Sequence, residues 1–319
     1  MITICIPTFK RPTLLQQALA TAIVQPATVV SDIIVVDNDC DSREVEVAMQ
    51  RFSSDGRIRY LRNDSNLGMF GNWNRCLDLV QTSHFSILSD DDLLLPTFAP
   101  VMAEAIRIWP NAVLIGGRAE VFDERTVSWR YHSWLAKTRA AARSLLLPSH
   151  WMLGSNHLAF ANYFGGATGV VIRTDVARTS GGFDATWYPV SDWEFWYRLS
   201  SKGQCIVLER TLGRYRTSVN ASLDARTVAN HILKSATLRK RMASDIDAHL
   251  TVLERATIHF SSKADDLLPT TLDGSRLLPS RPLYSIAVWF LSRLLKALSI
   301  RMCRPLPPSA HRVGETAGS

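Results

Sequence analysis

Cysteine is scarce in this chain of 319 residues, and its thiols lie far apart in the sequence. Their number is odd, and none of their spacings matches the short pairs that bind zinc. We therefore expect neither a disulfide framework nor a zinc site, and a reducing compartment such as the cytoplasm is the natural setting. The five cysteines are Cys5, Cys40, Cys76, Cys205 and Cys303.

The sequence also has no internal repeat, no low-complexity block and no basic leader before its first hydrophobic run. These absences argue against a solenoid and a disordered chain, and we expect no signal peptide. The composition is 46% hydrophobic and 20% charged, which is typical of a folded protein with a sizeable core.

Positive charge is unevenly placed along the chain. The formal net charge is +7, yet residues 280–319 carry six Lys and Arg against a single Glu. The remainder is nearly neutral, so we expect no nucleic-acid partner, which would need a basic patch on a folded domain. The apolar stretch 283–302 contains Arg293 and Lys296 and makes a poor membrane span. We expect an amphipathic helix on an anionic membrane surface, with a helix packed on the protein's own core as the alternative.

Short apolar runs alternate with helical periodicity in the first part of the chain. We predict strands at 2–6, 32–36, 58–61 and 85–88, and helices at 13–23, 43–52 and 71–80. This alternation across short loops predicts parallel βαβ units and an α/β fold. Further along, we predict a strand at 170–172, a helix at 192–199, a strand at 205–208 and helices within 226–260.

Polar clusters follow three of the predicted strands, at residues 7–10, 37–39 and 90–92. The carboxyl ends of parallel strands meet at one edge of a sheet, where ligands bind. We therefore expect the three clusters to converge. The last of them is Asp90-Asp91-Asp92, whose adjacent carboxylates repel each other. A divalent cation such as Mg²⁺ or Mn²⁺ would offset this charge, and a solvated acidic turn or a helix cap is the alternative.

Six motifs occur in an order that points to one family. They are Ile4 to Pro12 (ICIPTFKRP), Ile34 to Asn38 (IVVDN), Asn66-Leu67-Gly68, Leu88 to Asp92 (LSDDD), Gly181 to Asp184 (GGFD) and Asp192-Trp193-Glu194. Over residues 1–222 the sequence resembles family 2 glycosyltransferases of the GT-A fold. The resemblance implies a mixed, mostly parallel sheet flanked by helices. It also implies transfer of a sugar from a nucleotide-sugar donor to an acceptor hydroxyl with inversion.

The resemblance implies nucleotide contacts in the first two motifs. Pro7, Thr8 and Phe9 match the loop that touches the nucleotide, with Phe9 against the base; an ordinary packed aromatic is the alternative. Asp37 matches the acid that hydrogen-bonds the pyrimidine ring, and a cap for the following turn is the alternative.

The donor-side loop and the metal motif follow. Asn66, Gly68 and Asn72 match the donor side, although Asn and Gly are also common in turns.

In the metal motif, Asp91 and Asp92 are the expected ligands of Mg²⁺ or Mn²⁺, and Asp90 is expected to contact the donor. Two registers stay open, because Ser89 stands where the family often has the first acid, whereas the motif taken alone pairs Asp90 with Asp92.

Asp192 matches the catalytic base of the family, which accepts the proton of the acceptor hydroxyl. Ser191 occupies the place of the acid that usually precedes it. An N-cap of the following helix is the alternative for Asp192, and Glu194 is the second candidate for the base. Arg216 is expected to hold the donor diphosphate, with Arg214 as the alternative, because Ser218 stands where the family often has a His.

Three regions are expected: a glycosyltransferase domain at 1–222, a helical extension at 223–279 and a membrane-associating tail at 280–319. Acceptor choice is assigned to the variable region 118–163. We expect a UDP-, dTDP- or GDP-sugar donor and a glycan or lipid-linked acceptor in bacterial surface polysaccharide or lipopolysaccharide synthesis. The expected location is cytoplasmic, peripheral at the inner face of the cytoplasmic membrane.

Two other functions stay open. A nucleotidyltransferase-like enzyme would favour a glycine-rich phosphate loop after the first strand, and residues 7–12 contain no Gly. A degenerate, non-catalytic sugar-nucleotide-binding protein is the other, because Ser191 and Ser218 depart from the family pattern.

Overall fold

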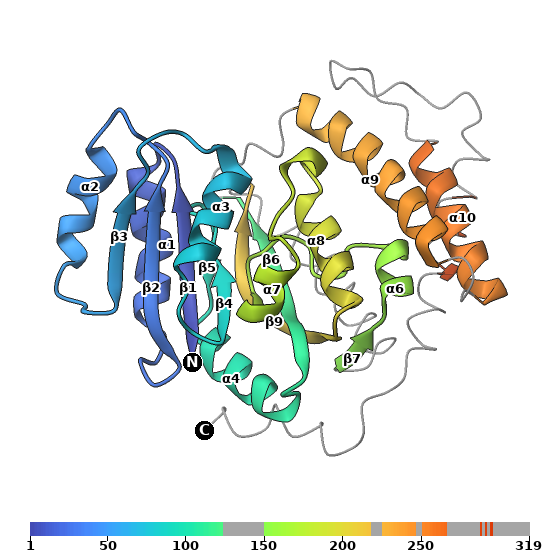
Figure 1. The fold of residues 1–319 in the computed structure, drawn as a ribbon, viewed down its shortest axis with the longest axis horizontal. Coiled ribbons are helices and arrows are strands. Elements are labelled where there is room, and N and C mark those ends of the chain that lie inside the picture. Colours follow the sequence, from blue (N-terminus) through green and yellow to red (C-terminus); the bar gives the residue numbers. More distant parts are fainter. Residues whose placement is uncertain are drawn as a thin grey trace.

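The computed structural model describes residues 1–123, 150–217, 225–246 and 251–266, with residues 288, 291, 294 and 295 of the tail. Its centre is a nine-stranded mixed sheet in the order β3-β2-β1-β4-β8-β6-β9-β5, with β7 paired to β9. Helices cover the sheet, and α9 and α10 lie side by side beyond α6 and α8 (Figure 1).

The strands are β1 (Ile2–Thr8), β2 (Val30–Asp37), β3 (Ile58–Arg62), β4 (His84–Ile87), β5 (Leu93–Leu94), β6 (Ala112–Phe122), β7 (His150–Leu153), β8 (Val170–Arg173) and β9 (Gln204–Arg216). The α-helices are α1 (Pro12–Ile23), α2 (Glu44–Met49), α3 (Gly68–Leu79), α4 (Phe98–Ile108), α6 (Ser155–Phe160), α7 (Thr174–Thr179), α8 (Ser191–Ser200), α9 (Ala225–Ile246) and α10 (Val252–Asp266). Two short 3₁₀ helices are η1 (Gln50–Phe52) and η2 (Ala185–Trp187).

The half of the sheet formed by β3, β2, β1 and β4 is entirely parallel. Every strand and helix predicted for this part of the chain is present. Thr8 pairs with Asp37, and Asp37 pairs with Arg62, so the carboxyl ends of three strands are level. These ends lie along the upper edge in Figure 1.

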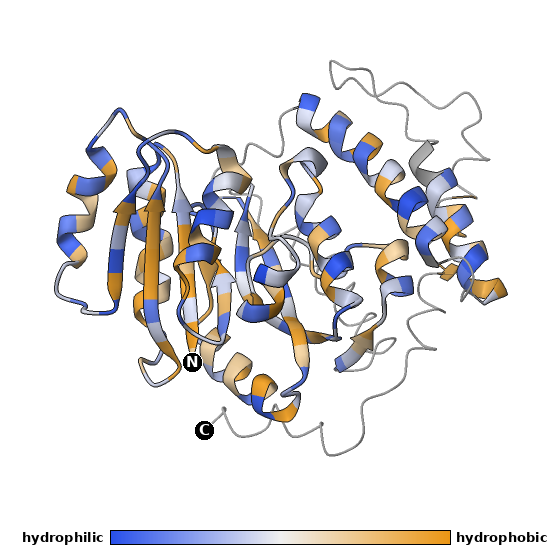
Figure 2. Cartoon of the chain, viewed as in Figure 1, coloured by the Kyte–Doolittle hydropathy of each residue, from blue (hydrophilic) through white to orange (hydrophobic). Residues whose placement is uncertain are grey.

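Alternate residues of these strands enter two different hydrophobic layers. Ile4 and Ile6 of β1 pack in the layer that contains α1 and α4, whereas Cys5 packs in the layer that contains α3. Burial on both faces explains why β1 and the second half of β2 are almost continuously hydrophobic (Figure 2).

β1 runs through Pro7, although we predicted that it ends at Ile6. Successive residues of a parallel strand face opposite neighbours. The Leu88 N–H donates to the Cys5 carbonyl on the β4 side, and the Asn38 N–H donates to the Thr8 carbonyl on the β2 side. Pro7 therefore faces the β4 side, beyond the last paired residue of β4. Its missing N–H ends that ladder and leaves the pairing with β2 intact.

The second half of the sheet was less predictable. β6 was not predicted from the sequence, and the predicted strand at 205–208 is the first part of the longer β9. β6 and β9 pair with several register shifts. Gly116 lies at a tight approach, since a Cβ there would be 2.3 Å from the Phe164 ring. Such local irregularity weakens the periodic pattern on which strand prediction depends.

Two helices follow the sheet. The side chain of Arg239 on α9 donates to the backbone carbonyls of Ala159 and Phe160 at the end of α6. Asn156 of α6 donates to Glu254 of α10.

No helix among the described residues is long and apolar enough to cross a membrane. Most of the predicted tail helix and residues 124–149 of the predicted acceptor region lie outside the described residues.

A two-glycine turn connects α7 to α8. Gly181 and Gly182 have φ angles of +82° and +67°. The side-chain amide of Asn74 on α3 donates to the Phe183 carbonyl and accepts from the Phe183 N–H, both at 2.8 Å. A Cβ on Gly182 would lie 2.4 Å from Asn74 Oδ1, whereas the space at Gly181 is open. This contact fixes the segment that leads to α8.

We expect Gly182→Ala to destabilise the protein more than Gly181→Ala. Both substitutions place a side chain at positive φ, which costs about 1–2 kcal/mol. Gly182→Ala also displaces Asn74 and adds about 1–3 kcal/mol for unsatisfied buried groups. Urea unfolding of both variants measures the difference, and equal free energies of unfolding would contradict the assigned contact.

Candidate active site

The three predicted polar clusters converge at the carboxyl edge of the parallel strands. The Thr8 hydroxyl donates to Asp90 Oδ2 at 2.8 Å, and the Phe9 N–H approaches the same oxygen at 3.4 Å. The Lys10 ammonium lies 3.9 Å from Asp39 Oδ1. The loops after β1, β2 and β4 are therefore in direct contact, as the parallel topology predicted.

Phe9 is exposed at this edge, with 41% of its surface accessible. The alternative of an ordinary packed aromatic is wrong, because the ring is not part of either hydrophobic layer. Lys10, the next residue, has a φ of +58°, which is uncommon outside glycine. An exposed ring on a constrained loop suits stacking on a flat ligand, and base contact at Pro7, Thr8 and Phe9 stays a prediction.

Asp37 is fully buried and accepts two hydrogen bonds. The Tyr60 hydroxyl donates to Oδ2 at 2.9 Å, and the Asp39 N–H donates to Oδ1 at 3.0 Å. Burial raises the pKa of Asp37 above its usual value. The turn-capping alternative is thus correct, and contact with a pyrimidine stays a prediction. Tyr60 was missed, because a tyrosine inside a strand gives no sequence signal of its partner.

The donor-side residues form an asparagine network. Asn63 donates to Asn38 Oδ1 at 3.0 Å and to Asn72 Oδ1 at 2.9 Å. Asn66 Oδ1 accepts from the Asn38 side chain at 2.7 Å and from the Gly68 N–H at 2.8 Å. The network shapes the loop before α3, so Asn66, Gly68 and Asn72 act first as supports of this edge. Their contact with a donor stays a prediction.

The aspartate triplet is buried, which rules out a solvated acidic turn. Asp90, Asp91 and Asp92 are 7%, 5% and 2% exposed. Burial raises all three pKa values, that of Asp90 to about 6 and that of Asp92 to about 7. Arg11 Nη1 lies 2.9 Å from Asp91 Oδ2 and 3.4 Å from Asp90 Oδ1. One guanidinium nitrogen is therefore shared by two carboxylates.

Asp92 points into the protein instead of toward this shared position. The Thr168 hydroxyl donates to Oδ2, and the Arg216 N–H donates to Oδ1 at 2.9 Å. Both oxygens of Asp92 accept hydrogen bonds that anchor neighbouring segments, so the geometry favours Asp90 with Asp91 over the expected pair Asp91 and Asp92, and the metal ligands stay a prediction. Asp90 and Asp91 are the two acids whose oxygens converge on one cation.

Arg216 is fully buried, which contradicts its expected role as a diphosphate ligand. Its Nε donates to the Asp91 carbonyl at 2.7 Å, and its Nη2 donates to Gln17 Oε1 at 2.6 Å. The guanidinium also lies over the Phe122 ring, 4.7 Å from its centroid. Arg216 therefore supports the triplet from inside. Arg11 faces its outer side, and its place before Pro12 gave no sequence signal of this contact.

The residues fit a divalent cation completed by a substrate. The described part of the chain contains no group of three His, Cys, Asp or Glu residues that could hold a metal ion. Mg²⁺ in phosphate-handling sites is commonly held by one or two carboxylates together with substrate phosphates. Asp90 and Asp91, which already share one positive group, would hold such an ion.

Asp192 lies in the first turn of α8 and is half-buried. Burial raises its pKa to about 7, and its Oδ1 accepts from the Trp193 N–H at 2.7 Å. The N-cap alternative is wrong, because the helix begins at Ser191 and the cap is Val190. A carboxylate that titrates near neutrality suits a general base.

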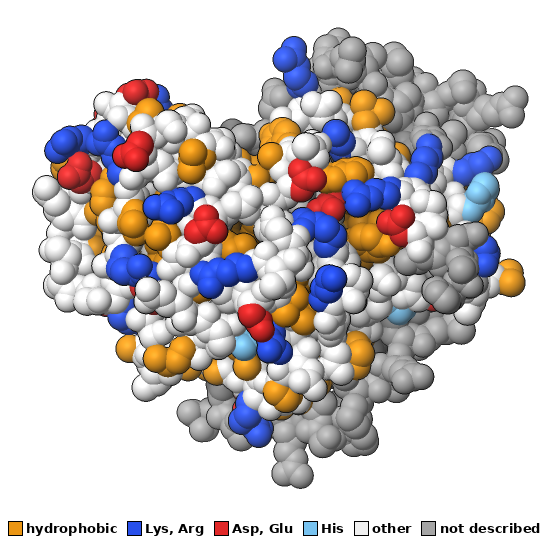
Figure 3. Space-filling view, in the orientation of Figure 1, with side chains coloured by type: hydrophobic (Ala, Val, Ile, Leu, Met, Phe, Trp, Pro, Cys, Tyr) orange, Lys and Arg blue, Asp and Glu red, His pale blue; other side chains and the backbone are white. Residues whose placement is uncertain are grey.

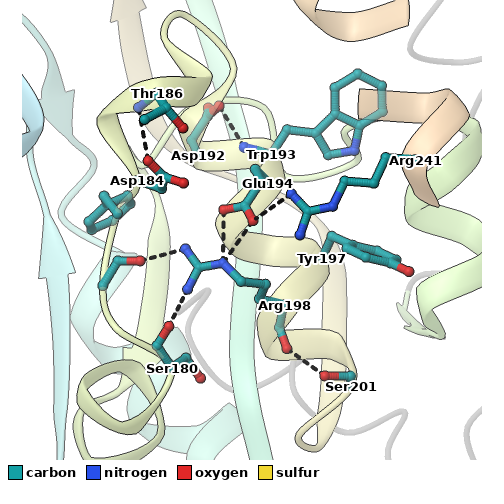
Figure 4. Close-up of polar contacts among 12 residues, drawn as sticks. Ser180, Asp184, Thr186, Asp192, Trp193, Glu194, Tyr197, Arg198, Ser201 and Arg241 are labelled. Atoms are coloured by element: carbon teal, nitrogen blue, oxygen red, sulfur yellow. Dashed lines mark hydrogen bonds and ion pairs between the residues drawn. The ribbon is translucent and has the colours of Figure 1, made fainter. Parts of the chain in front are cut away.

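Glu194 is excluded as the base because it is committed to an ion pair. Arg198 Nε lies 2.8 Å and 2.9 Å from its two carboxylate oxygens. Arg198 also donates to the carbonyls of Ser180 and Gly182, so this pair holds α8 against the two-glycine turn (Figure 4). Residues two apart lie about 200° apart around a helix, and Asp192 faces away from this pair.

One short segment connects the two acidic sites. The Asn162 side chain lies near enough to Asp192 to lower its pKa slightly against the effect of burial, and the Thr168 hydroxyl donates to Asp92 Oδ2. Six residues of extended chain span at most about 22 Å, which limits the separation of the two backbone ends. The segment 162–168 therefore runs from beside Asp192 to the carboxylates after β4.

The sequence profile described as Glycosyl transferase family 2 matches residues 3–165, which include the loops after β1, β2 and β4. The chain belongs to glycosyl transferase family 2. An uncharacterized protein of Mycobacterium tuberculosis is 25% identical over 237 residues, which is 73% of this chain and 72% of that protein.

Solved structures show the same fold at low sequence identity. TarS 1–349 of S. aureus in complex with UDP-GlcNAc has a TM-score of 0.56 at 12% identity, covering 94% of this chain and 89% of that one. The mannosyltransferase PcManGT from Pyrobaculum calidifontis, in complex with GDP-Man and Mn²⁺, has a TM-score of 0.51 at 12% identity, covering 94% and 87%. The predicted GT-A fold class is confirmed.

Thr168→Val removes the hydroxyl that holds Asp92 and keeps the side-chain shape. We expect a loss of about 1–3 kcal/mol in the free energy of unfolding. Thr174→Val is the matched control, because the equally buried Thr174 hydroxyl has no hydrogen-bond partner among the described residues. Chemical denaturation should separate the two variants; similar losses would mean that the Thr168–Asp92 contact is not stabilising.

Proposed function

We propose that this family 2 member is a metal-dependent, inverting hexosyl- or deoxyhexosyltransferase that uses a nucleotide-diphosphate sugar. The observation that carries the proposal is the arrangement of its acids. Asp90 and Asp91 converge at the carboxyl edge, and the segment 162–168 connects their loop to Asp192, whose pKa is about 7.

In this reaction the acceptor hydroxyl oxygen attacks the anomeric carbon while the bond from that carbon to the diphosphate oxygen breaks. Asp192 accepts the hydroxyl proton, and attack opposite the leaving group inverts the configuration. A bound divalent cation supplies neutralisation of the charge that develops on the leaving diphosphate. Phe9 offers an apolar face for the base, and Asp37 lies level with Thr8 on the same edge.

For the donor we propose a UDP-, dTDP- or GDP-sugar. The similar folds of TarS, solved with UDP and UDP-GlcNAc, and of PcManGT, solved with GDP-Man and Mn²⁺, support this class. Stabilisation of the protein by each nucleotide sugar, with and without Mn²⁺, tests it, because a bound ligand raises the melting temperature by mass action. If no nucleotide sugar stabilises the protein, a donor site at this edge is contradicted.

For the pathway we propose synthesis of a bacterial surface polysaccharide or lipopolysaccharide on a glycan or lipid-linked acceptor, at the inner face of the cytoplasmic membrane. The basic excess of residues 280–319 supports a membrane partner. On the face shown in Figure 3, Lys and Arg are interspersed with Asp and Glu.

We expect a chain that ends at Ser280 to lose its association with anionic liposomes and to stay folded. The tail carries most of the net positive charge, and association driven by this charge weakens as salt screens it. Flotation of both forms at two salt concentrations measures the effect. Equal flotation of the full and shortened chains would contradict the membrane role of the tail.

We expect Asp192→Asn to lower the transfer rate by about 10²–10⁴-fold, the usual contribution of a general base. Activity of the unchanged protein should fall as the pH drops below about 7, because a protonated Asp192 cannot accept the acceptor proton. Initial rates of sugar transfer as a function of pH, and of nucleotide-sugar hydrolysis in Mn²⁺, measure both effects.

The stability of Asp192→Asn shows whether a loss of activity comes from the missing carboxylate or from unfolding. Because the pKa of Asp192 is raised in the folded state, its ionisation lowers the stability between the ordinary pKa and about pH 7, and this loss is complete at pH 8, so Asp192→Asn should be no less stable there. An active Asp192→Asn would contradict the assignment of the base, and a binding-competent but inactive variant supports it over a non-catalytic binding protein.

A further inference from the structure

Arg11 occupies the position at which Asp90 and Asp91 converge. Its Nη1 is the atom shared by the two carboxylates, at 2.9 Å from Asp91 Oδ2 and 3.4 Å from Asp90 Oδ1. We propose that Arg11 is the resident counter-ion of this pair and that a divalent cation binds by displacing it. The inference rests on the proposed metal-dependent function and assigns Arg11 the control of metal affinity.

The Arg11 guanidinium and a divalent metal ion compete for the same position beside Asp90 and Asp91. A divalent ion of the Mg²⁺ type contacts carboxylate oxygens at about 2.0–2.1 Å, closer than a guanidinium nitrogen does. Asp91 Oδ2 is the closest acidic oxygen to Nη1, and a metal on that oxygen would stand against the guanidinium. Two positive charges at that separation repel, so the side chain of Arg11 moves when the metal binds.

The two arginines at the triplet differ in their ability to move. Arg216 is fully buried, and its guanidinium is held by the Asp91 carbonyl and by Gln17. The side chain of Arg11 is 32% exposed at the outer side of the carboxylates. The Leu15 N–H donates to the Arg11 carbonyl and fixes its backbone at the start of α1. The Arg11 backbone can therefore stay in place while its side chain moves aside.

The charge balance at the triplet predicts that loss of the Arg11 charge lowers the stability of the protein without metal and raises its affinity for the metal. The three buried carboxylates face two guanidiniums in the metal-free protein. Removing the charge of Arg11 leaves the pair less compensated, so the metal-free protein becomes less stable. The same change removes the competitor, so the metal binds more tightly. A purely structural role for Arg11 predicts the loss of stability without the gain in affinity.

The test compares two adjacent residues carrying the same substitution, Arg11→Gln and Lys10→Gln, in the full chain. Lys10 pairs with Asp39 and not with the triplet, so its variant controls for net charge. Mn²⁺ alone is titrated into each protein, and the free ion is followed by its paramagnetic resonance signal. We expect Arg11→Gln to bind Mn²⁺ at least about tenfold more tightly than the unchanged protein, as loss of a close like charge predicts. Lys10→Gln should stay within about twofold, because its charge is farther away and screened.

Without metal, Arg11→Gln should also melt at a lower temperature than the unchanged protein. Addition of Mn²⁺ should raise its melting temperature by more than it raises that of the unchanged protein. Unchanged or weaker Mn²⁺ binding in Arg11→Gln overturns the proposal, and so does an equal gain in Lys10→Gln. Arg11→Ala is the second variant if Arg11→Gln does not fold, with the same expected tightening. Donor-dependent stabilisation of the unchanged protein reports on the proposed function separately, so it can hold while the role of Arg11 fails. If no variant binds Mn²⁺, the metal dependence and the role of Arg11 fall together.

Discussion

The structure depends on the burial of three adjacent carboxylates at the end of β4. Two parts of the chain satisfy them: the end of β1 and the loop after it, through Thr8 and Arg11, contact Asp90 and Asp91, whereas Thr168 and the end of β9 contact Asp92. Buried charges are costly unless they are paired and hydrogen-bonded, so these contacts hold the carboxyl edge together. The edge is in turn the place where parallel strands present a ligand site.

The segment that contacts Asp92 also reaches Asp192, the acid in the first turn of α8. Thr168 holds one end of the segment 162–168, and Asn162 meets Asp192 at the other. The Glu194–Arg198 ion pair fixes α8 on its opposite side, against the two-glycine turn. A fold made of a regular parallel half and an irregular second half thereby positions the carboxylate pair Asp90 and Asp91 and the separate carboxylate of Asp192.

The parallel half of the sheet could be predicted from the sequence, because the periodicity of its strands and helices and the alternation between them are regular there. Strand and helix patterns predicted the parallel half, and parallel pairing alone predicted that Thr8, Asp37 and Asp90 meet. Prediction from the sequence failed where a role depends on side-chain direction. Nothing in the sequence says that Asp92 points inward or that Arg216 is buried beside it, and the irregular pairing of β6 with β9 obscured a long strand.

The central claim is that Asp90 and Asp91 form the cation site of a donor pocket that Asp192 completes. A crystal structure with UDP and Mn²⁺, with the ion located by its anomalous scattering, tests this most directly. We expect Mn²⁺ on Asp91, with Asp90 beside it, the diphosphate completing its coordination and Arg11 moved from the position it holds here. Mn²⁺ bound at Asp92, or a nucleotide bound away from this edge, would contradict it.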